Sequence, residues 1–140
     1  MMISIDTNVF AVLWNNHDSS NLAAASTLGK LRLQNRLMVS APVYAELLAG
    51  PLRTEAALDQ FFAETEIEVD WMLEENVWRE AGKAYREYVK RRKKSSGGAS
   101  RRILADFLIG AHALVGGHSL LTIDKSHYAT AFPKLKVISI

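Results

Sequence analysis

The chain has 140 residues, a formal net charge of +2 and no cysteine. We expect one domain over residues 1–140, and the lack of cysteine excludes disulfides and thiolate metal sites and is typical of a reducing compartment. No apolar run approaches the roughly 20 residues of a membrane span, and the first residues lack the basic region of a signal peptide, so we expect a cytoplasmic protein without a membrane partner.

Strand-like and helix-like segments alternate along the chain. The predicted strands are residues 2–5, 37–40, 67–70, 119–123 and 136–140. The predicted helices are residues 7–16, 20–35, 42–49, 54–64, 74–93, 103–115 and 125–131. This alternation predicts an α/β fold with a mainly parallel five-stranded sheet and helices on both faces.

Local signals mark several of the predicted boundaries. Asp6 is placed to cap the first helix, and Ser19 or Ser20 to cap the second. Pro42 fits the first turn of the third helix, where its missing N–H costs nothing. A serine- and glycine-rich segment at residues 95–100 predicts a flexible loop.

Positive charge is concentrated in one part of the sequence. Residues 79–102 carry ten Lys or Arg and two Glu, a net +8, whereas the rest of the chain carries a net −6. A local positive field on a nearly neutral protein suits a polyanionic partner. A solvated helix face would give the same pattern, so the charge distribution leaves both interpretations open.

Four acidic residues stand in apolar sequence, at strand ends or on helices expected to face inward. These residues are Asp6, Glu46, Asp106 and Asp124. Carboxylates are rarely buried without compensation, and the carboxyl ends of strands in open α/β proteins are where ligands bind. Because carboxylate oxygens suit Mg²⁺ and Mn²⁺, a shared ion of this kind is the simplest compensator.

Each acid also has a purely structural interpretation. Asp6 could serve only as a helix cap, and Glu46 could lie on an exposed helix edge. Asp106 could pair with Arg102, four residues earlier on the same helix face. Asp124 could be a turn residue before the helix that follows. It is their joint placement that favours a metal site.

Five sequence segments carry a resemblance to a known family. They are Ile-Asp-Thr-Asn-Val at 5–9, Pro-Val-Tyr-Ala-Glu-Leu-Leu-Ala-Gly at 42–50, Leu-Ala-Asp-Phe-Leu-Ile-Gly-Ala-His-Ala-Leu at 104–114, Leu-Leu-Thr-Ile-Asp at 120–124 and Phe-Pro-Lys-Leu-Lys-Val-Ile at 132–138. In this order and spacing the chain resembles the PIN-domain family, and within it the VapC-type toxins of bacterial toxin–antitoxin pairs. The resemblance covers essentially the whole chain.

The resemblance implies a metal-dependent endoribonuclease that hydrolyses RNA phosphodiester bonds, and a toxin that pairs with a cognate antitoxin and forms a homodimer. The family's acidic site falls on Asp6, Glu46, Asp106 and Asp124, and its polar helpers fall on Thr7 or Asn8 and on Thr122. On this view the first three acids hold the principal Mg²⁺ or Mn²⁺ ion, and Asp124 helps with a second ion or orients the attacking water.

The basic stretch is the predicted clamp for the RNA backbone. Its residues are Arg91, Arg92, Lys93, Lys94, Arg101 and Arg102. The main alternative is a catalytically silent or DNA-directed nucleic-acid-binding protein, because the site chemistry does not read the sugar. A phosphatase of another α/β family would need a glycine-rich phosphate cradle after the first strand, and residues 6–10 contain no glycine.

Overall fold

The computed structural model describes residues 1–51, 53–94 and 102–140. Within them the strands are β1 (Met2–Ile5), β2 (Arg36–Ser40), β3 (Glu68–Asp70), β4 (Ser119–Thr122) and β5 (Val137–Ser139). The helices are α1 (Thr7–Leu13), α2 (Asn21–Gln34), α3 (Ala41–Leu48), α4 (Glu55–Thr65), α5 (Glu75–Lys94), α6 (Leu104–Gly116) and α7 (Lys125–Ala131).

The five strands form one parallel sheet in the order β3-β2-β1-β4-β5, which confirms the predicted sheet. β1 is the central strand, and its Ile5 is aligned with Leu121 of β4. The backbone N–H of Asp6 continues this pairing by donating to the Leu121 carbonyl at 2.9 Å. Residues that follow β1 and β4 therefore leave the sheet at the same edge.

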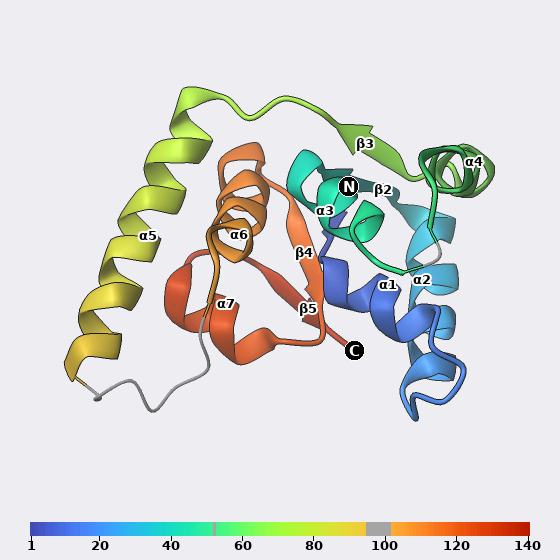
Figure 1. Ribbon diagram of the computed structural model, residues 1–140, viewed down its shortest axis with the longest axis horizontal. Coiled ribbons are helices and arrows are strands. Elements are labelled where there is room, and N and C mark those ends of the chain that lie inside the picture. The colour runs from blue at the N-terminus through green and yellow to red at the C-terminus, as the bar shows by residue number, and fades with distance from the viewer. Residues whose placement is uncertain (52, 95–101) are drawn as a thin grey trace.

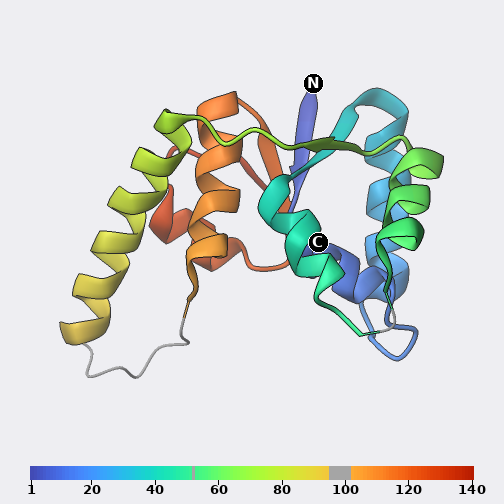
Figure 2. The same ribbon diagram turned by 45° about the horizontal axis from the view of Figure 1, so that its top comes forward.

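Helices cover the sheet on both sides, as predicted. Figures 1 and 2 show α5, α6 and α7 gathered on one side of the strands, and α1, α2 and α4 on the other. The sheet order requires this arrangement. The chain moves from β1 to β2 to β3 in one direction and from β3 to β4 to β5 in the other, and right-handed crossovers in opposite directions place their helices on opposite faces.

The core holds in place the elements that lead to the carboxyl edge. β1 and β4 are buried over almost their whole length, as expected for parallel strands covered on both faces. Phe10 of α1, Phe107 of α6 and Tyr128 of α7 are among the largest fully buried side chains. Three helices that begin at this edge are therefore anchored in the core within their first turns.

Some boundaries follow the predicted signals and others differ. The Asp6 side chain caps α1, and Pro42 lies in the first turn of α3, as predicted. α1 ends at Leu13 rather than near residue 16, because the side-chain amide of Asn21 donates to the Leu13 carbonyl at 2.6 Å and satisfies the last turn. Ser20 stands at the N-cap of α2 but makes no capping hydrogen bond through its side chain, contrary to the prediction.

Part of the predicted basic clamp lies outside the described residues. This part is Arg101, and the predicted loop at residues 95–100 also lies outside them. None of the helices in the described ranges combines the length and apolar character needed to cross a membrane.

Candidate active site

The four predicted acids line a single cavity of about 290 Å³. Each comes from a different element: Asp6 follows β1, Glu46 lies on α3, Asp106 lies in the first turn of α6 and Asp124 follows β4. The other lining residues are Thr7, Asn8, Arg102, His127 and Tyr128. The fold thus brings together all four acids, which are spread over almost the full length of the chain.

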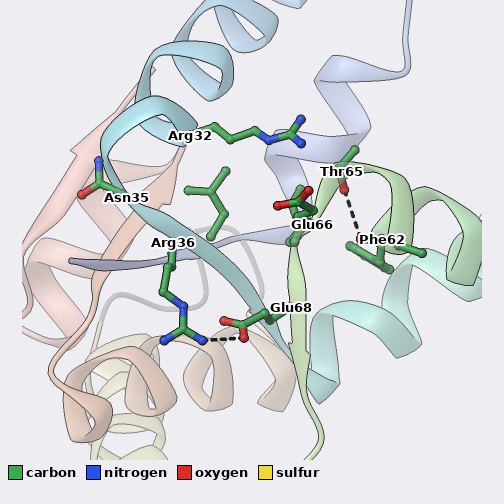
Figure 3. A pocket seen from close by; sticks show the side chains of 10 residues that line it. Arg32, Asn35, Arg36, Phe62, Thr65, Glu66 and Glu68 are labelled. Atoms are coloured by element: carbon green, nitrogen blue, oxygen red, sulfur yellow. Dashed lines mark hydrogen bonds and ion pairs between the residues drawn. The ribbon is translucent and has the colours of Figure 1, made fainter.

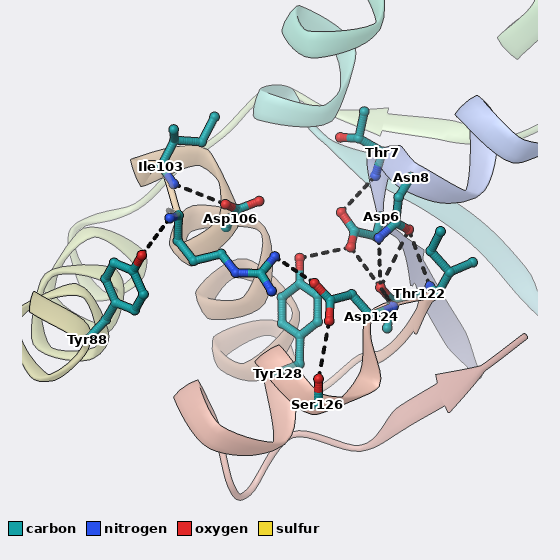
Figure 4. Close-up of polar contacts among 12 residues, drawn as sticks. Asp6, Thr7, Asn8, Tyr88, Ile103, Asp106, Thr122, Asp124, Ser126 and Tyr128 are labelled. Carbon is teal, nitrogen blue, oxygen red and sulfur yellow. Dashed lines mark hydrogen bonds and ion pairs between the residues drawn. The ribbon is translucent and has the colours of Figure 1, made fainter. Parts of the chain in front are cut away.

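Asp6 is the most deeply buried of the acids, with 5% of its surface exposed. Its Oδ1 accepts a hydrogen bond from the Thr7 backbone N–H at 2.8 Å. Its Oδ2 accepts from the hydroxyl of Thr122 at 2.8 Å and from that of Tyr128 at 2.9 Å (Figure 4). These three donors fix the orientation of the carboxylate.

The pKa of the Asp6 carboxyl group reflects this setting. Burial and, to a smaller extent, the charge of Asp106 raise this pKa from 3.8 to about 6, against the lowering effect of the three hydrogen bonds. The pKa of Glu46 is also raised, mainly by burial and additionally by Asp106, although the Thr7 hydroxyl donates to Glu46 Oε1 at 2.6 Å. Asp6, Glu46 and Asp106 therefore form one electrostatically coupled group.

Asp106 does not pair with Arg102, so that structural interpretation is wrong. Its Oδ2 accepts a hydrogen bond from the Ile103 backbone N–H at 3.1 Å, across the first turn of α6. Arg102 instead places Nη1 2.6 Å from Oδ2 of Asp124. α6 begins at Leu104, so Arg102 precedes the helix and is not held on the helical face that carries Asp106.

The predicted polar helpers Asn8 and Thr122 connect the loops that carry the acids. The Asn8 side-chain amide donates to the Thr122 hydroxyl at 3.3 Å, and the Asn8 oxygen accepts from the Ile123 backbone N–H at 3.3 Å. The Thr122 hydroxyl also accepts from the Asp124 backbone N–H at 3.0 Å, while it donates to Asp6. These contacts tie the segment after β1 to the segment after β4.

The donors that line the cavity fit a hard divalent cation. They include four carboxylates together with the oxygens of Thr7 and Asn8, and the described lining supplies one guanidinium against them. No three acidic or histidine side chains in the described ranges are already placed to hold one ion. Such an open arrangement suits Mg²⁺, which keeps several waters and binds through one or two carboxylates.

The basic end of α5 has one residue, Arg91, whose charge reaches the lining of this cavity. α5 ends in Arg91, Arg92, Lys93 and Lys94. The pKa of His127, which lines the cavity, is lowered mainly by burial, and the positive charges of Arg102 and Arg91 lower it further. Of the predicted RNA-binding cations, Arg102 therefore lies in the acidic cavity itself, and Arg91 lies near His127 but lines a separate cavity between α5 and α7.

Two tyrosines that sequence reasoning missed help to hold the site. Tyr128 donates to Asp6, and the hydroxyl of Tyr88 accepts from the Arg102 backbone N–H at 2.7 Å. Tyr128 lies four residues after Asp124, and this helical spacing could have predicted that Tyr128 lies on the same side of the helix as Asp124 and therefore near the site. No local spacing joins Tyr88 on α5 to Arg102, which stands just before α6.

A larger cavity of about 490 Å³ lies at the opposite, amino end of β2 and β3. Its lining includes Arg32, Arg36, Glu66 and Glu68, and Figure 3 shows that Arg36 and Glu68 meet there in an ion pair. Their side chains are 70% and 47% exposed, so both charges remain largely solvated. This cavity lacks the buried, converging acids of the first one.

Comparison with protein families gives one match over nearly the whole chain. The family model described as the PIN domain matches residues 3–133. No curated protein matches this sequence.

Solved structures with the same fold include several toxin–antitoxin complexes. VapBC2 from Rickettsia felis, bound to a DNA fragment from its promoter, is 21% identical, has a TM-score of 0.72 and is aligned over 99% of this chain and 98% of its own. VapBC-1 from nontypeable Haemophilus influenzae is 22% identical, with a TM-score of 0.68 and the same coverage. A toxin–antitoxin complex from Klebsiella pneumoniae is 18% identical, with a TM-score of 0.61 and coverage of 98% and 96%.

Proposed function

We infer the function from the premise that this chain belongs to the PIN domain family. We propose that it is a metal-dependent endoribonuclease and the toxin of a toxin–antitoxin pair. The observation that carries the proposal is the convergence of Asp6, Glu46, Asp106 and Asp124 on one cavity, with Asp6 buried and its pKa raised to about 6.

The proposed cofactor is Mg²⁺ or Mn²⁺, held directly or through its bound waters by Asp6, Glu46 and Asp106, since Asp106 acts electrostatically on both of the other acids. When bound, such an ion lowers the pKa of a coordinated water and stabilises charge on the phosphate oxygens. Thr122 and Tyr128 keep the Asp6 carboxylate fixed by occupying its Oδ2. Asn8 holds the Thr122 loop against the start of α1.

The proposed substrate is RNA, supported by Arg102 in the cavity lining and by the basic end of α5, whose Arg91 acts on His127 of that lining. Contacts from Arg91, Arg92, Lys93 and Lys94 to phosphates position a strand without reading its bases, so binding should weaken as salt increases. Lys90 is paired with Glu87 on the same helix and is not part of the proposed clamp.

The proposed protein partners are a cognate antitoxin and a second copy of this chain. The support is the fold shared with solved toxin–antitoxin complexes, together with an acidic cavity that a basic side chain of an antitoxin could enter. Size-exclusion chromatography with light scattering, on the chain alone and co-expressed with the product of an adjacent gene, tests both partners.

The proposed function is tested by cleavage of a mixed structured RNA by the purified chain. Reactions contain Mg²⁺, Mn²⁺ or EDTA and compare the parent with Asp6→Asn and, as a matched control, Glu68→Gln at the other end of the sheet. We expect cutting that requires metal, disappears in Asp6→Asn and persists in Glu68→Gln. Absence of both cutting and Mn²⁺ binding in the parent would overturn the enzyme proposal, and equal cutting of DNA would overturn the RNA preference.

A further inference from the structure

Arg102 is fixed at both ends beside the acids. Its backbone N–H donates to the Tyr88 hydroxyl at 2.7 Å, which ties it to α5. Its guanidinium Nη1 lies 2.6 Å from Asp124 Oδ2, which ties it to the segment after β4. Both side chains of this ion pair are 27% exposed, so the pair is open to the cavity that it lines.

The Arg102 guanidinium retains donors for a ligand. A guanidinium carries five N–H donors in a planar fork that matches the oxygens of a phosphate. Within the described ranges, the guanidinium of Arg102 forms an ion pair with Asp124, and it does so through Nη1. The other N–H groups of the Arg102 guanidinium can therefore donate to a ligand in the cavity that Arg102 and the four acids line.

Asp124 differs from the other three acids in its electrical setting. Asp106 raises the pKa of both Asp6 and Glu46, so its charge repels both of these carboxylates. Asp124 instead has a guanidinium in direct contact and also accepts a hydrogen bond from the Ser126 hydroxyl at 3.4 Å. The cavity therefore divides into a three-acid side and an Arg102–Asp124 side.

We propose that Arg102 binds a non-bridging oxygen of the RNA phosphate, that Asp124 acts as its positioning residue, and that the divalent ion is held without Asp124. This inference rests on the proposed nuclease function and deepens it. A phosphate entering a cavity with four carboxylates meets repulsion, and a fixed guanidinium next to the three-acid side offsets it. The sequence-based prediction is that Asp124 helps with a second ion or orients the attacking water. Here Asp124 instead positions Arg102.

The experiment separates ion binding from substrate binding in the full-length chain. The variants are Arg102→Gln, Arg102→Lys, Asp124→Asn and the double variant, with Asp106→Asn as the ion-site reference. Arg36→Gln is the matched control, since Arg36 forms an ion pair of the same length at the other end of the sheet. Mn²⁺ affinity is measured by titration calorimetry, and KM and kcat are measured on one RNA at fixed Mn²⁺.

We expect Arg102→Gln to raise KM by roughly tenfold or more, since hydrogen bonds to charged groups have energies of this order. Its Mn²⁺ affinity should stay within about threefold of the parent or become tighter, because a cation leaves the cavity. Asp124→Asn should raise KM in the same direction and also leave Mn²⁺ affinity within about threefold, and the double variant should add little because the two residues act as one unit. Arg102→Lys should give an intermediate KM.

Two results would overturn the inference while leaving the nuclease proposal intact. One is a loss of Mn²⁺ affinity in Asp124→Asn as large as that in Asp106→Asn, which would make Asp124 an ion ligand. The other is an unchanged KM in folded Arg102→Gln, or in Arg102→Lys if the first variant does not fold, which would leave only a structural ion pair. A parent chain that cuts no RNA overturns the nuclease proposal and the phosphate role together.

Discussion

The two ends of the sheet carry ion pairs of the same length in different surroundings. Arg36–Glu68 at the amino end and Arg102–Asp124 at the carboxyl end both measure 2.6 Å. The first pair is largely exposed beside the larger cavity, and the second is mostly buried beside three further acids. Cavity size and ion-pair length therefore do not distinguish the candidate active site from the other cavity. The distinguishing feature is buried negative charge that the protein only partly compensates.

The largest difference between the two ends is expected when one acid is neutralised at each. Asp106→Asn removes the charge that raises the pKa of both Asp6 and Glu46, and it should lower the cleavage rate by at least about a hundredfold. Glu68→Gln should change the rate by less than about twofold, because its exposed charge is already solvated. Initial rates with Mn²⁺ decide this, and equal losses at both ends would contradict it.

The next largest effect concerns the pH dependence of stability in the metal-free protein. The pKa of the Asp6 carboxyl group is about 6 in the folded protein and 3.8 in the unfolded chain. The folded state therefore binds the proton more tightly, and the free energy of unfolding should fall as pH rises from below 3.8 to above 6, by about 3 kcal/mol in total from this group.

Urea unfolding at pH 4.5 and pH 7.5 spans about 2 kcal/mol of this effect, measured as the difference between the parent and Asp6→Asn. The variant should lack the Asp6 part of the decrease and should be the more stable protein at pH 7.5. Mn²⁺ should raise the melting temperature of the parent and not of Asp6→Asn. An identical pH dependence in both proteins would show that burial does not destabilise the Asp6 charge.

A smaller effect is expected from Tyr128→Phe, which removes one of the two hydroxyls that donate to Asp6 Oδ2. Loss of this donor should raise the pKa of Asp6 and move the acid limb of the pH–rate profile upward by on the order of one unit. The rate at the pH optimum should fall only modestly, because Thr122 still fixes the carboxylate. A profile that does not move would show that the Tyr128 hydroxyl serves packing alone.

The smallest effect is expected at the amino end. Arg36→Gln breaks an ion pair whose side chains are 70% and 47% exposed, and it should change the free energy of unfolding by less than about 1 kcal/mol. Thermal unfolding at low and high salt measures this change. A loss of several kcal/mol there would remove the contrast between the two ends.

The sequence predicts the elements and the convergence of the acids because both depend on local patterns. Asp6 and Asp124 follow buried apolar strands, and parallel pairing of those strands brings both to one edge. Helix α7 has the predicted bounds, Lys125–Ala131, and Pro133 follows closely after its end; the Asp124 side chain stands at the N-cap position but makes no capping hydrogen bond.

The partner of Arg102 could not be predicted, since it depends on where α6 begins. If the helix included residue 102, Arg102 would lie over Asp106; it begins two residues later, and Arg102 reaches Asp124 instead. The choice depends on a boundary shift smaller than the usual uncertainty of sequence-based helix ends. The contact between Tyr128 and Asp6 spans 122 residues and follows from the sheet order rather than from any local pattern.

The central position of β1 sets the order in which the site is completed on the ribosome. The chain emerges N-terminus first at about 5–20 residues per second, so β1 can pair with β2 long before β4 exists. Thr122 and Tyr128, which hold Asp6, are made 116 and 122 residues after it. A nascent chain, or one ended early by a stop codon, therefore carries Asp6 without its supports. On the proposed function, a nascent chain does not hold Asp6 in its cleaving orientation until residue 128 has been synthesised.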